Sequence, residues 1–492
     1  MSGVAIVGSG PNGLAAAVTL ARAGVHVRVI EAEPTIGGGA RTLQLTEPGF
    51  LHDWGSAVHP MALASPFFRE FGLADRVRFA IPDASYAQAM PGRSAIAWRS
   101  LERTADELGR DGRAWRRLFA PLVRQRDRLV ESVLGSMLPL PRHPLITARF
   151  GARVLLHGTR AGARTFREAN APALIAGVAA HASGPMPSFG SAATGLMLAT
   201  LAHGDGWPIP IGGSQAIVDA LMAELLSLGG VVETGDRVTS IADVGDVDAV
   251  LLDVALARLP GLIGDHLPDS AARSLRQYVG GGGRPGNGLS KVDFALSAPV
   301  PWSDHRLAEA GTVHLGGTAR EVWAAEREVT AGRPARHPYV LLSQPSRFDP
   351  SRAPAGRHTV WAYIHVPHGS TLDATEQITA RIEEFAPGFR DTVLASQATT
   401  AADLESHDAN LIGGDIGSGF VTLRSMLARP VLSRRPWRTP MPGVYLCSAS
   451  TVPGPGVHGM AGHLAAKTVL RDVFGHRGFA GSGDRVGGAN YD

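Results

Sequence analysis

The sequence predicts an α/β fold in which a parallel sheet is interleaved with a second lobe of α+β type. Two short apolar runs, at 3–7 and 26–31, flank a long Ala/Leu/Val stretch, which is the pattern of two buried parallel strands joined by a helix. A glycine-rich turn opens that helix, and a similar turn opens an apolar helical stretch within 452–470. Further buried-strand patterns at 247–254 and 443–450 indicate that the sheet is assembled from distant segments.

The composition is that of an ordinary globular protein. Its 492 residues are 44% hydrophobic and 18% charged, enough for two domains or two interleaved lobes. Cys447 is the only cysteine, which excludes an intrachain disulfide, a thiolate zinc site and a CxxC redox pair, and favours a reducing, cytoplasmic setting. We expect no signal peptide, and no apolar run reaches the ~20 residues needed to span a bilayer. A net charge of +3 does not predict a nucleic-acid partner.

The first glycine-rich turn has the spacing of a dinucleotide-binding loop. Gly8, Gly10 and Gly13 form G-x-G-x-x-G between a strand and a helix, which permits a tight turn, a close approach to a pyrophosphate, and close packing of the helix on the strand. The pyrophosphate would meet the free N–H groups at the helix N-terminus. Glu31 ends the next strand, where a carboxylate accepts hydrogen bonds from an adenosine ribose. A solvated strand end is the alternative for Glu31.

A second glycine segment identifies a family resemblance. "EAEPTIGGGART", residues 31–42, resembles the FAD-dependent amine oxidases and phytoene desaturases, in which a GG-x-x-R-[ST] segment follows the first βαβ unit. In that family the glycines lie against the cofactor and the arginine contacts its phosphates, which suits a guanidinium fork. The resemblance therefore implies FAD rather than NAD. In this part of the chain it implies cofactor contacts from Gly8, Gly10, Pro11, Asn12, Gly13, Glu31, Ala32, Gly38, Gly39, Arg41 and Thr42.

Residues 206–241 are predicted to return to the cofactor lobe. A turn, an amphipathic helix, a stop at Gly229–Gly230 and a strand follow one another there. The resemblance implies a strand-turn-strand, with a backbone contact from Val238 to adenine. We therefore expect a Rossmann-type, GR2-like FAD-binding domain interleaved with an α+β substrate domain. The predicted ranges are 1–65, 205–285 and 400–475 for the first domain, 66–204 and 286–399 for the second, and 476–492 for a flexible tail.

The glycine-rich turn near the C-terminus is predicted to reach the same cofactor. Its helix begins near 457–462, and the positive end of that helix would stabilise the flavin ring, which becomes anionic on reduction. Together with "GWPIPIGGSQAI", "GGDIGSG" and "WRTPMPGVYLCSAS", the stretch "PGPGVHGMAGHLAA" resembles the phytoene dehydrogenase-related branch, including its pyridine nucleotide-disulphide oxidoreductase domain proteins. The resemblance implies that Gly456, Val457 and His458 lie at the isoalloxazine.

Three side chains are candidates for catalysis. Lys291, in "GNGLSKVDFALSAPVPW", matches a lysine that flavin amine oxidases hold near N5 through a water, and Trp302 matches a tryptophan that follows it. The alternative for Lys291 is an exposed lysine at a strand end. His458 lies in the C-terminal loop, where helix capping is the alternative. His59 follows the arginine segment toward the expected substrate cavity. We expect no metal site.

Residues 142–167 are a candidate membrane contact, because they contain six arginines and no acidic residue. On one continuous helix, five of these arginines fall within an arc of about 60°, with Val154, Leu155 and Phe166 opposite. Such a basic amphipathic surface suits peripheral contact with anionic lipid on the inner face of a membrane. A solvated or partner-facing surface is the alternative. The arginines of the arc are Arg149, Arg153, Arg160, Arg164 and Arg167.

The leading functional hypothesis is an FAD-dependent dehydrogenase or desaturase. It would remove a hydride and a proton from an apolar, isoprenoid or other lipid-like small molecule, and pass electrons to oxygen or a quinone. The alternatives are a flavin amine or amino-acid oxidase, a flavin-bound isomerase, and a non-catalytic lipid-escort protein that has lost the cofactor. The intact FAD motifs argue against the escort protein. The sequence predicts no particular oligomeric state.

Overall fold

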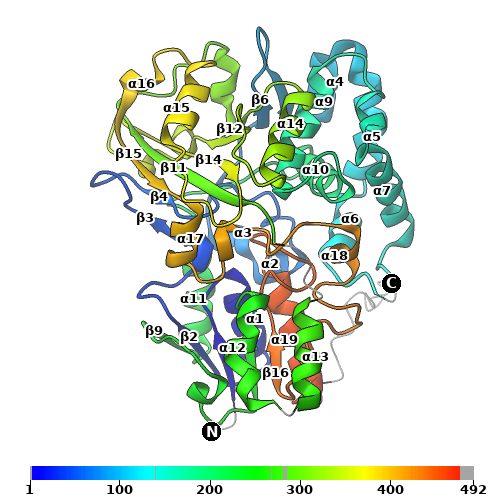
Figure 1. The fold of residues 1–492 in the computed structure, drawn as a ribbon, viewed down its shortest axis with the longest axis vertical. Helices are drawn as coiled ribbons and strands as arrows, with labels where there is room; N and C mark the ends of the chain where they lie inside the picture. Colours follow the sequence, from blue (N-terminus) through cyan, green and yellow to red (C-terminus); the bar gives the residue numbers. More distant parts are fainter. Residues whose placement is uncertain (1–2, 139, 268, 281–284, 477–492) are drawn as a thin grey trace, which may run out of the picture.

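The computed structural model describes residues 3–138, 140–267, 269–280 and 285–476, which form two lobes (Figure 1). The lower lobe in Figure 1 is built on a parallel sheet of five strands in the order β16-β10-β1-β2-β9. This confirms the predicted α/β fold with a parallel sheet. The strands are β1 Val4–Val7, β2 Val27–Glu31, β9 Val231–Thr234, β10 Ala249–Leu252 and β16 Val444–Leu446.

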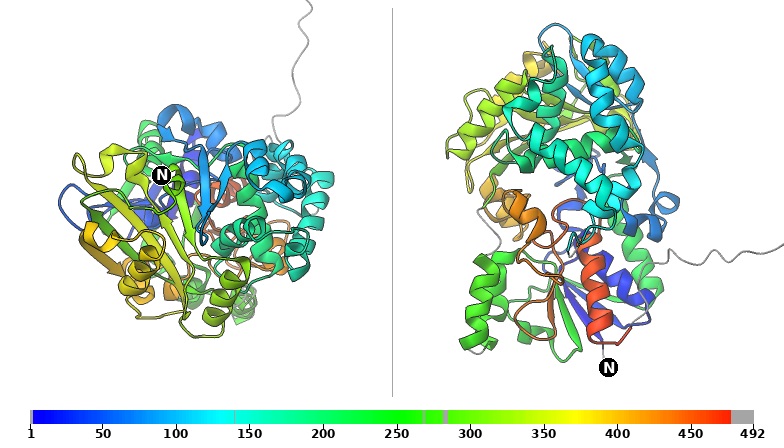
Figure 2. Two further views of the ribbon diagram at one scale, coloured as in Figure 1. Left: turned by 90° about the horizontal axis from the view of Figure 1, so that it is seen from above. Right: turned by 90° about the vertical axis from the view of Figure 1, so that its right-hand side faces the viewer.

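Helices cover both faces of the parallel sheet, because its central strand β1 is apolar on both sides. Val4 and Ile6 belong to a core shared with α1 (Pro11–Arg22), α11 (Gln215–Ser227) and α19 (Met460–Asp472). Ala5 and Val7 belong to a core on the other face, shared with α12 (Leu259–Ile263) and α13 (Asp269–Gly280). In the right-hand view of Figure 2, the blue α1 and the red α19 lie side by side.

The upper lobe is built on a mixed sheet of seven strands, in the order β15-β11-β14-β13-β12-β6-β7. One face packs on α15 (Thr375–Glu383), and this core includes Val292, Val313 and Ala362. The other face is turned toward α9 (Asn170–Ala179), α10 (Phe189–Ala202) and α14 (Ala319–Thr330). The strands are β6 Ala84–Gln88, β7 Ala95–Trp98, β11 Gly288–Leu296, β12 Ala310–Leu315, β13 Val340–Ser343, β14 His358–Val366 and β15 Val393–Thr399.

Further elements connect these layers or pack beside them. The remaining helices are α2 Pro66–Phe71, α3 Leu73–Arg76, α4 Leu101–Glu107, α5 Gly112–Val123, α6 Arg126–Val133, α7 Pro144–His157, α8 Arg160–Ala163, α16 Phe389–Thr392, α17 Ala401–His407 and α18 Leu423–Leu427. Two small antiparallel pairs join β3 (Thr42–Leu43) to β4 (His52–Asp53), and β5 (Phe79–Ala80) to β8 (Ile209–Pro210).

The structure differs from the expectations in three segments. The strands β6 and β7 were not predicted: they pair with each other, and β6 joins the sheet by pairing with β12, which is remote in sequence. After β9 the chain turns without forming the second strand expected around Val238. The range 142–167 is divided at Gly158, which ends α7, so that one continuous helix is not formed. The predicted tail from residue 477 onward lies outside the described residues. Across the described part of the chain, helices are too short or too polar to cross a bilayer.

Candidate active site

The first glycine loop connects β1 to α1, and its glycine positions leave no room for a side chain. A Cβ on Gly13 would lie 2.2 Å from the carbonyl oxygen of Gly8, and a Cβ on Gly10 would lie 2.9 Å from Oδ2 of Asp253. Gly8 has a φ of +100°, which strongly favours glycine. Pro11 and Asn12 open the helix, with Pro11 at a position where its missing N–H is not needed. The helix N-terminus therefore lies at the carboxyl edge of the sheet, where a pyrophosphate binds in this type of fold.

A carboxyl group that the sequence analysis did not single out occupies part of this N-terminus. Asp253 follows β10, and its Oδ2 accepts a hydrogen bond of 2.8 Å from the Gly13 N–H. Burial raises the pKa of Asp253 to about 7. The hydrogen bond from Gly13 lowers this pKa, whereas the nearby charges of Asp408 and Glu31 raise it further. The signal that identifies such a residue is its place at the carboxyl end of a strand beside β1.

Glu31 joins the end of β2 to the glycine loop. Its Oε2 accepts hydrogen bonds from the Ser9 N–H (2.8 Å) and the Ser9 hydroxyl (2.6 Å), and its Oε1 accepts one from the Glu33 N–H (2.9 Å). Glu31 is buried, so the alternative of a solvated strand end is wrong. Because a carboxylate oxygen offers two acceptor positions, Oε1 retains one for a ribose hydroxyl. The next residue, Ala32, is partly buried, and Val238 packs on the core beneath this edge of the sheet.

The second glycine segment packs directly against the first loop. A Cβ on Gly38 would lie 3.3 Å from the Cα of Gly10, whereas a Cβ on Gly39 would meet no atom within 4 Å. Arg41 is buried, and its guanidinium donates to the backbone carbonyls of Gly38 (2.9 Å) and His407 (3.3 Å). Within the described ranges, no carboxylate lies within 4 Å of this guanidinium. A buried cation bound only to neutral carbonyls fits a phosphate of the cofactor.

Thr42 supports this segment from its other side. Its hydroxyl donates to Oδ1 of Asp53 (2.8 Å) and accepts from the Gln215 N–H at the start of α11 (3.1 Å). Asp53 is fully buried, and its Oδ2 is bound by the Arg352 guanidinium at 2.8 Å. The cofactor segment is thereby fixed to the second lobe.

The two glycine loops meet where α1 and α19 begin, as expected. A Cβ on Gly462 would lie 1.8 Å from the backbone oxygen of Asn12, so the two helices touch backbone to backbone. In the loop before α19, Gly454, Gly456 and Gly459 have φ values of +110°, +133° and +66°. The N-termini of α1 and α19 therefore lie side by side, and a shared cofactor site for the two loops stays a prediction.

His458 holds the second loop from within, and it is buried. Its Nδ1 accepts a hydrogen bond of 3.0 Å from the Met460 N–H, and its Nε2 lies 3.2 Å from the carbonyl oxygen of Gly454. Because a backbone N–H can only donate, Nε2 must carry the proton. Burial lowers the pKa of His458 to about 4, so the ring is neutral at pH 7. This geometry favours the helix-capping alternative; a catalytic role for His458 stays a prediction. Val457 is half-buried in the same loop.

Lys291 lies in a buried charged cluster on the helix-facing side of the mixed sheet. Its Nζ is 2.6 Å from Oδ2 of Asp293, and both side chains are buried. The alternative of a solvent-exposed lysine is therefore wrong. The ammonium lies 5.5 Å from the ring centre of Trp54, a cation–π contact. Trp54 also lies under the Arg41 guanidinium at 5.7 Å, so one indole connects the candidate catalytic lysine with the candidate phosphate-binding arginine.

Two further groups complete the surroundings of Lys291. Burial raises the pKa of Asp293 to about 6, and Lys291 opposes this shift. Oδ1 of Asp293 lies 3.6 Å from Nδ1 of His52, whose pKa is lowered to about 3 by burial and by Lys291. Trp302 is not part of this cluster: it packs in the core behind the sheet and donates its indole N–H to Gln344 (3.2 Å). The match of Trp302 to a flavin-site tryptophan is therefore wrong.

His59 joins the 52–60 segment to the start of α11. Its Nε2 lies 2.7 Å from the Ser214 hydroxyl oxygen, and its backbone N–H donates to the carbonyl oxygen of Pro208. Burial lowers the pKa of His59 to about 4. A catalytic role for His59 stays a prediction, and its contacts are those of a side chain that orders this segment.

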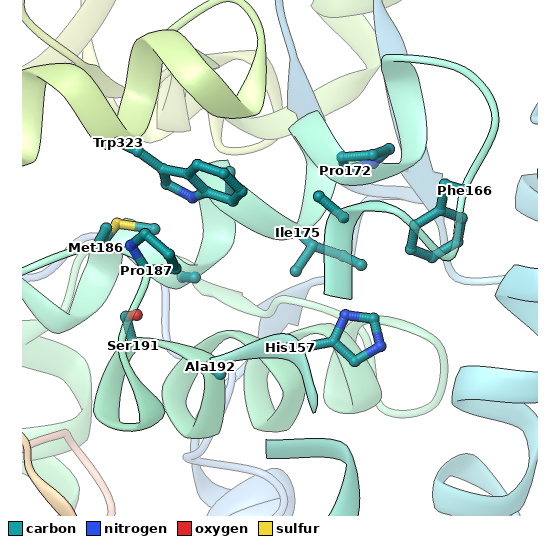
Figure 3. Close-up of a pocket in the computed structure, with 12 residues that line it drawn as sticks. His157, Phe166, Pro172, Ile175, Met186, Pro187, Ser191, Ala192 and Trp323 are labelled. Atoms are coloured by element: carbon teal, nitrogen blue, oxygen red, sulfur yellow. The ribbon is translucent and has the colours of Figure 1, made fainter. Parts of the chain in front are cut away.

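A pocket lies between α9 and α10 (Figure 3). Its free volume is about 20 Å³, room for about one water molecule. Ala176, Ala179 and Met186 belong both to the pocket and to a buried apolar cluster that also contains Trp54 and Tyr363. We call this cluster the inner apolar cluster, and it connects the pocket to the surroundings of Lys291. Its remaining buried members are Ala57, Ala180, Leu289, Ala319, Val322, Ala325, Val329, Ala335, Tyr339, Leu341, Trp361 and Leu404.

The structure resembles two solved structures over almost the whole chain. It aligns with an oxidoreductase from Methanosarcina mazei with a TM-score of 0.61 at 17% identity, covering 95% of this chain and 99% of that one. It aligns with a putrescine oxidase triple mutant with a TM-score of 0.59 at 18% identity, covering 96% and 99%. At these identities the likeness shows the fold.

Sequence relatives extend over most of the chain as well. Pyridine nucleotide-disulfide oxidoreductase domain-containing protein 2 of Rattus norvegicus is 25% identical, covering 95% of this chain and 93% of the relative. Phytoene dehydrogenase of Streptomyces griseus is 27% identical, covering 80% and 77%. The family model of flavin-containing amine oxidoreductases matches residues 12–470, which include Gly13, Glu31, Arg41, Lys291 and the C-terminal loop. The chain is thus a member of the flavin-containing amine oxidoreductase family, with FAD as its cofactor.

Proposed function

We propose that this protein is an FAD-dependent dehydrogenase or desaturase of an apolar, lipid-like small molecule. One substrate C–H bond would break as a hydride and the neighbouring C–H bond would lose a proton, so that a double bond forms and FAD gains two electrons. Oxygen or a quinone would then take the two electrons from the reduced cofactor. The phytoene dehydrogenase of Streptomyces griseus, similar over 80% of this chain, supports an apolar substrate.

The observation that carries the proposal is the inner apolar cluster between the pocket and Lys291. Trp54, Leu289 and Tyr363 form its inner part, and Met186 and Ala179 its outer part at the pocket. Most of this surface is apolar, so a polar substrate would lose its hydration there and find few hydrogen-bond partners, which is costly. An apolar substrate gains free energy from the same surface, at about 25 cal/mol for each Å² removed from water.

The residues of the chain bind the cofactor, orient it and handle the proton. When bound, FAD supplies the hydride acceptor at its flavin ring. Arg41 and the α1 N-terminus suit its phosphates, and the N-terminus of α19 favours negative charge near the C-terminal loop. Asp293 Oδ1 accepts no hydrogen bond from the described residues, and the neighbouring ammonium of Lys291 is 2.6 Å from Oδ2. This oxygen is positioned to accept the companion proton directly or through a water.

Amine oxidation is the second candidate, and one observation favours it. Trp361 and Tyr363 form an edge-to-face pair with ring centres 5.2 Å apart, and Tyr363 is the direct β-sheet partner of Lys291. Aromatic faces beside the candidate catalytic lysine would attract a cationic amine. The putrescine oxidase fold is consistent with this reading, although its identity of 18% carries the fold alone.

Anaerobic reduction of the bound flavin separates the two candidates. The purified holoprotein is mixed with a panel of carotenoids, other lipids, acyl compounds and amines, and the loss of flavin absorbance is followed. We expect bleaching by an apolar compound and none by simple amines. Bleaching by amines alone would refute the proposed function. A Lys291→Met/Asp293→Asn double variant, which removes both charges of the buried pair together, should bind FAD and bleach at least about tenfold more slowly because the proton acceptor is gone.

A further inference from the structure

We propose that the outer surface of α7 and α8, which lies beside the pocket between α9 and α10, docks on an anionic lipid bilayer. We call this surface, residues 144–164, the basic helix surface. The inference goes beyond the proposed function, because membrane docking does not depend on which apolar compound is oxidised.

The first step is the direction of the apolar side chains on α7. Ile146, Phe150 and Val154 are buried against the rest of the lobe. Leu145, Leu155 and Leu156 are 82%, 54% and 42% exposed. Leu155 was expected on the side opposite the arginines, together with Val154. The structure exposes Leu155 and buries Val154, because the helix packs through Ile146, Phe150 and Val154.

These exposed leucines form a continuous apolar stripe rather than scattered positions. Residues 145, 148, 152 and 156 follow the spacing of one helix face, and Ala148 and Ala152 are exposed between the leucines. Solvent-exposed leucines cost free energy unless something apolar covers them. The inward side of α7 already packs on the protein through apolar residues, so the outward leucines are free to enter the boundary between headgroups and acyl chains.

The second step is the charge around the stripe. Arg149, Arg160 and Arg164 are exposed, and within the described ranges none of them lies within 4 Å of a carboxylate. Residues 112–167 contain twelve arginines and only two acidic residues, Asp127 and Glu131. Several arginines of the region are engaged otherwise. Arg116 pairs with Glu102, Arg126 with Asp205 and Arg142 with Glu131, and Arg153 donates to backbone carbonyls, including that of Leu118.

This combination of charge and leucines fits an anionic bilayer better than an acidic protein. Long arginine stems can lie along the acyl boundary while their guanidinium groups reach lipid phosphates, so leucines and arginines can share one helix face. Arg113 and Arg117 of the neighbouring α5 are exposed too, which extends the positive charge beyond α7. The face that carries α5 and α7 is turned toward the viewer in the right-hand panel of Figure 2.

The third step is the continuity between the basic helix surface and the pocket. His157, the last residue of α7, and Ala163 of α8 both line the pocket. Figure 3 shows His157 and Phe166 on one side of it, opposite Trp323 of α14. Leu155 and Leu156 lie immediately before His157. Apolar side chains are therefore continuous from these leucines to the pocket, and from the pocket to the inner apolar cluster.

The test is flotation of the holoprotein with vesicles, with no substrate present. Vesicles of phosphatidylcholine alone are compared with vesicles that also contain phosphatidylglycerol. We expect the protein to float with the anionic vesicles and to be released by high salt. An Arg149→Glu/Arg160→Glu/Arg164→Glu variant should bind them about a hundredfold less, since each arginine near the surface contributes roughly a fivefold factor. A Leu145→Asn/Leu155→Asn/Leu156→Asn variant should lose about tenfold or more.

Matched controls exclude general effects of charge and exposure. Leu226 on α11 is 54% exposed, as Leu155 is, and Arg276 on α13 is an exposed helical arginine of the other lobe. Leu226→Asn and Arg276→Glu should float like the wild type. The flavin absorbance and the melting temperature of every variant show whether it is folded.

Three results would overturn the proposal. The wild type could fail to float with anionic vesicles. The charge-reversed and leucine variants could float as well as the two controls. Light scattering could show a dimer that the leucine substitutions dissociate, in which case the surface is an interface between copies of the chain. Because flotation uses no substrate, each of these results leaves the bleaching test of the proposed function unaffected.

Discussion

The two glycine loops place helix N-termini at the same site, but their glycines serve different physical purposes. In the first loop, Gly10 and Gly13 are required for close approach, since a Cβ on either would lie within 3 Å of another atom. In the second loop, Gly454 and Gly459 have positive φ, which other residues rarely adopt. Space is therefore the main limit at Gly10 and Gly13 of the first loop, although its Gly8 also has a φ of +100°. In the second loop the backbone conformation is an added limit, since a Cβ on Gly459 would also lie 2.6 Å from the Phe67 ring.

The side chains that hold the two loops have opposite acid–base behaviour. The first loop is held by Asp253, whose pKa burial raises to about 7. The second is held by His458, whose pKa burial lowers to about 4. Near pH 7 both groups tend toward their neutral forms. Asp253 and His458 therefore add little charge beside the two helix N-termini, which are the groups expected to face an anionic cofactor.

The largest effect is expected where the two loops touch. In Gly462→Ala, the new methyl group would overlap the Asn12 carbonyl, because its Cβ would lie 1.8 Å from that oxygen. Separation of α1 from α19 should lower the free energy of unfolding by about 3 kcal/mol or more and release FAD. Urea unfolding and the flavin content after gel filtration measure the two effects.

Gly151→Ala is the control for this substitution. No atom lies within 4 Å of the Cβ position of Gly151, which is inside α7. The variant should be as stable as the wild type or more stable by about 0.5–1 kcal/mol, since alanine favours the helix. If Gly462→Ala keeps its FAD and its stability, the two loops do not meet as described.

A smaller effect is expected when the support of the second loop is removed. His458→Ala leaves the Met460 N–H and the Gly454 carbonyl without their partner, at a cost of about 1–3 kcal/mol. The folded pKa of His458, about 4, is below the unfolded value of 6.5, so its contribution to stability is present above pH 6.5 and is lost as the pH falls toward 4.

Unfolding in urea at several pH values between 4 and 7 tests both parts of this prediction. The variant should show a shallower loss of stability on acidification than the wild type. The other buried histidines, such as His59 and His203, shift in the same direction and preserve part of the slope. An unchanged slope would show that His458 is not buried as a neutral cap.

The sequence predicted the cofactor lobe far better than the second lobe, for a physical reason. The β1 loop, Glu31 and Arg41 form a local unit in which spacing along the chain determines contact. Asp253 was missed because its partner, the Gly13 N–H, is 240 residues away. Trp302 was wrongly assigned to the flavin site. It follows β11, and the sequence does not show on which face of the mixed sheet its side chain packs. The strands β6 and β7 were missed because their stability depends on pairing with the distant β12.

The support of the first loop should respond to pH in the opposite sense. The folded pKa of Asp253, about 7, is above the unfolded value of 3.8, so this residue destabilises the fold progressively as the pH rises from 4 toward 7. Asp253→Asn keeps an acceptor for the Gly13 N–H and removes the charge. The variant should be more stable than the wild type by about 1 kcal/mol at pH 8 and should bind FAD more tightly there.

The pH dependence distinguishes this cause from a general improvement in packing. The advantage of Asp253→Asn should shrink as the pH falls below 6, because Asp253 is then protonated in the wild type. Thermal unfolding at pH 5.5 and pH 8, and FAD titration at the same pH values, are the measurements. A variant that is less stable at both pH values would mean that the carboxylate form is the one that holds the loop.

The smallest effect on the fold is expected at Gly39, the glycine of the second segment that has open space around it. No atom lies within 4 Å of its Cβ position, so Gly39→Ala should change the stability of the FAD-free protein by less than about 0.5 kcal/mol. If the space in front of Gly39 is filled by the cofactor, the same methyl group should weaken FAD binding by roughly tenfold. Gly261→Ala is the control, since Gly261 in α12 also has open space around it but lies on the other face of the parallel sheet. Fluorescence titration with FAD compares the affinities of the two variants. Equal affinities would place the cofactor away from Gly39. A loss of affinity confined to Gly39→Ala would show that this segment, like Gly10 and Gly13, has no room for a side chain when FAD is bound.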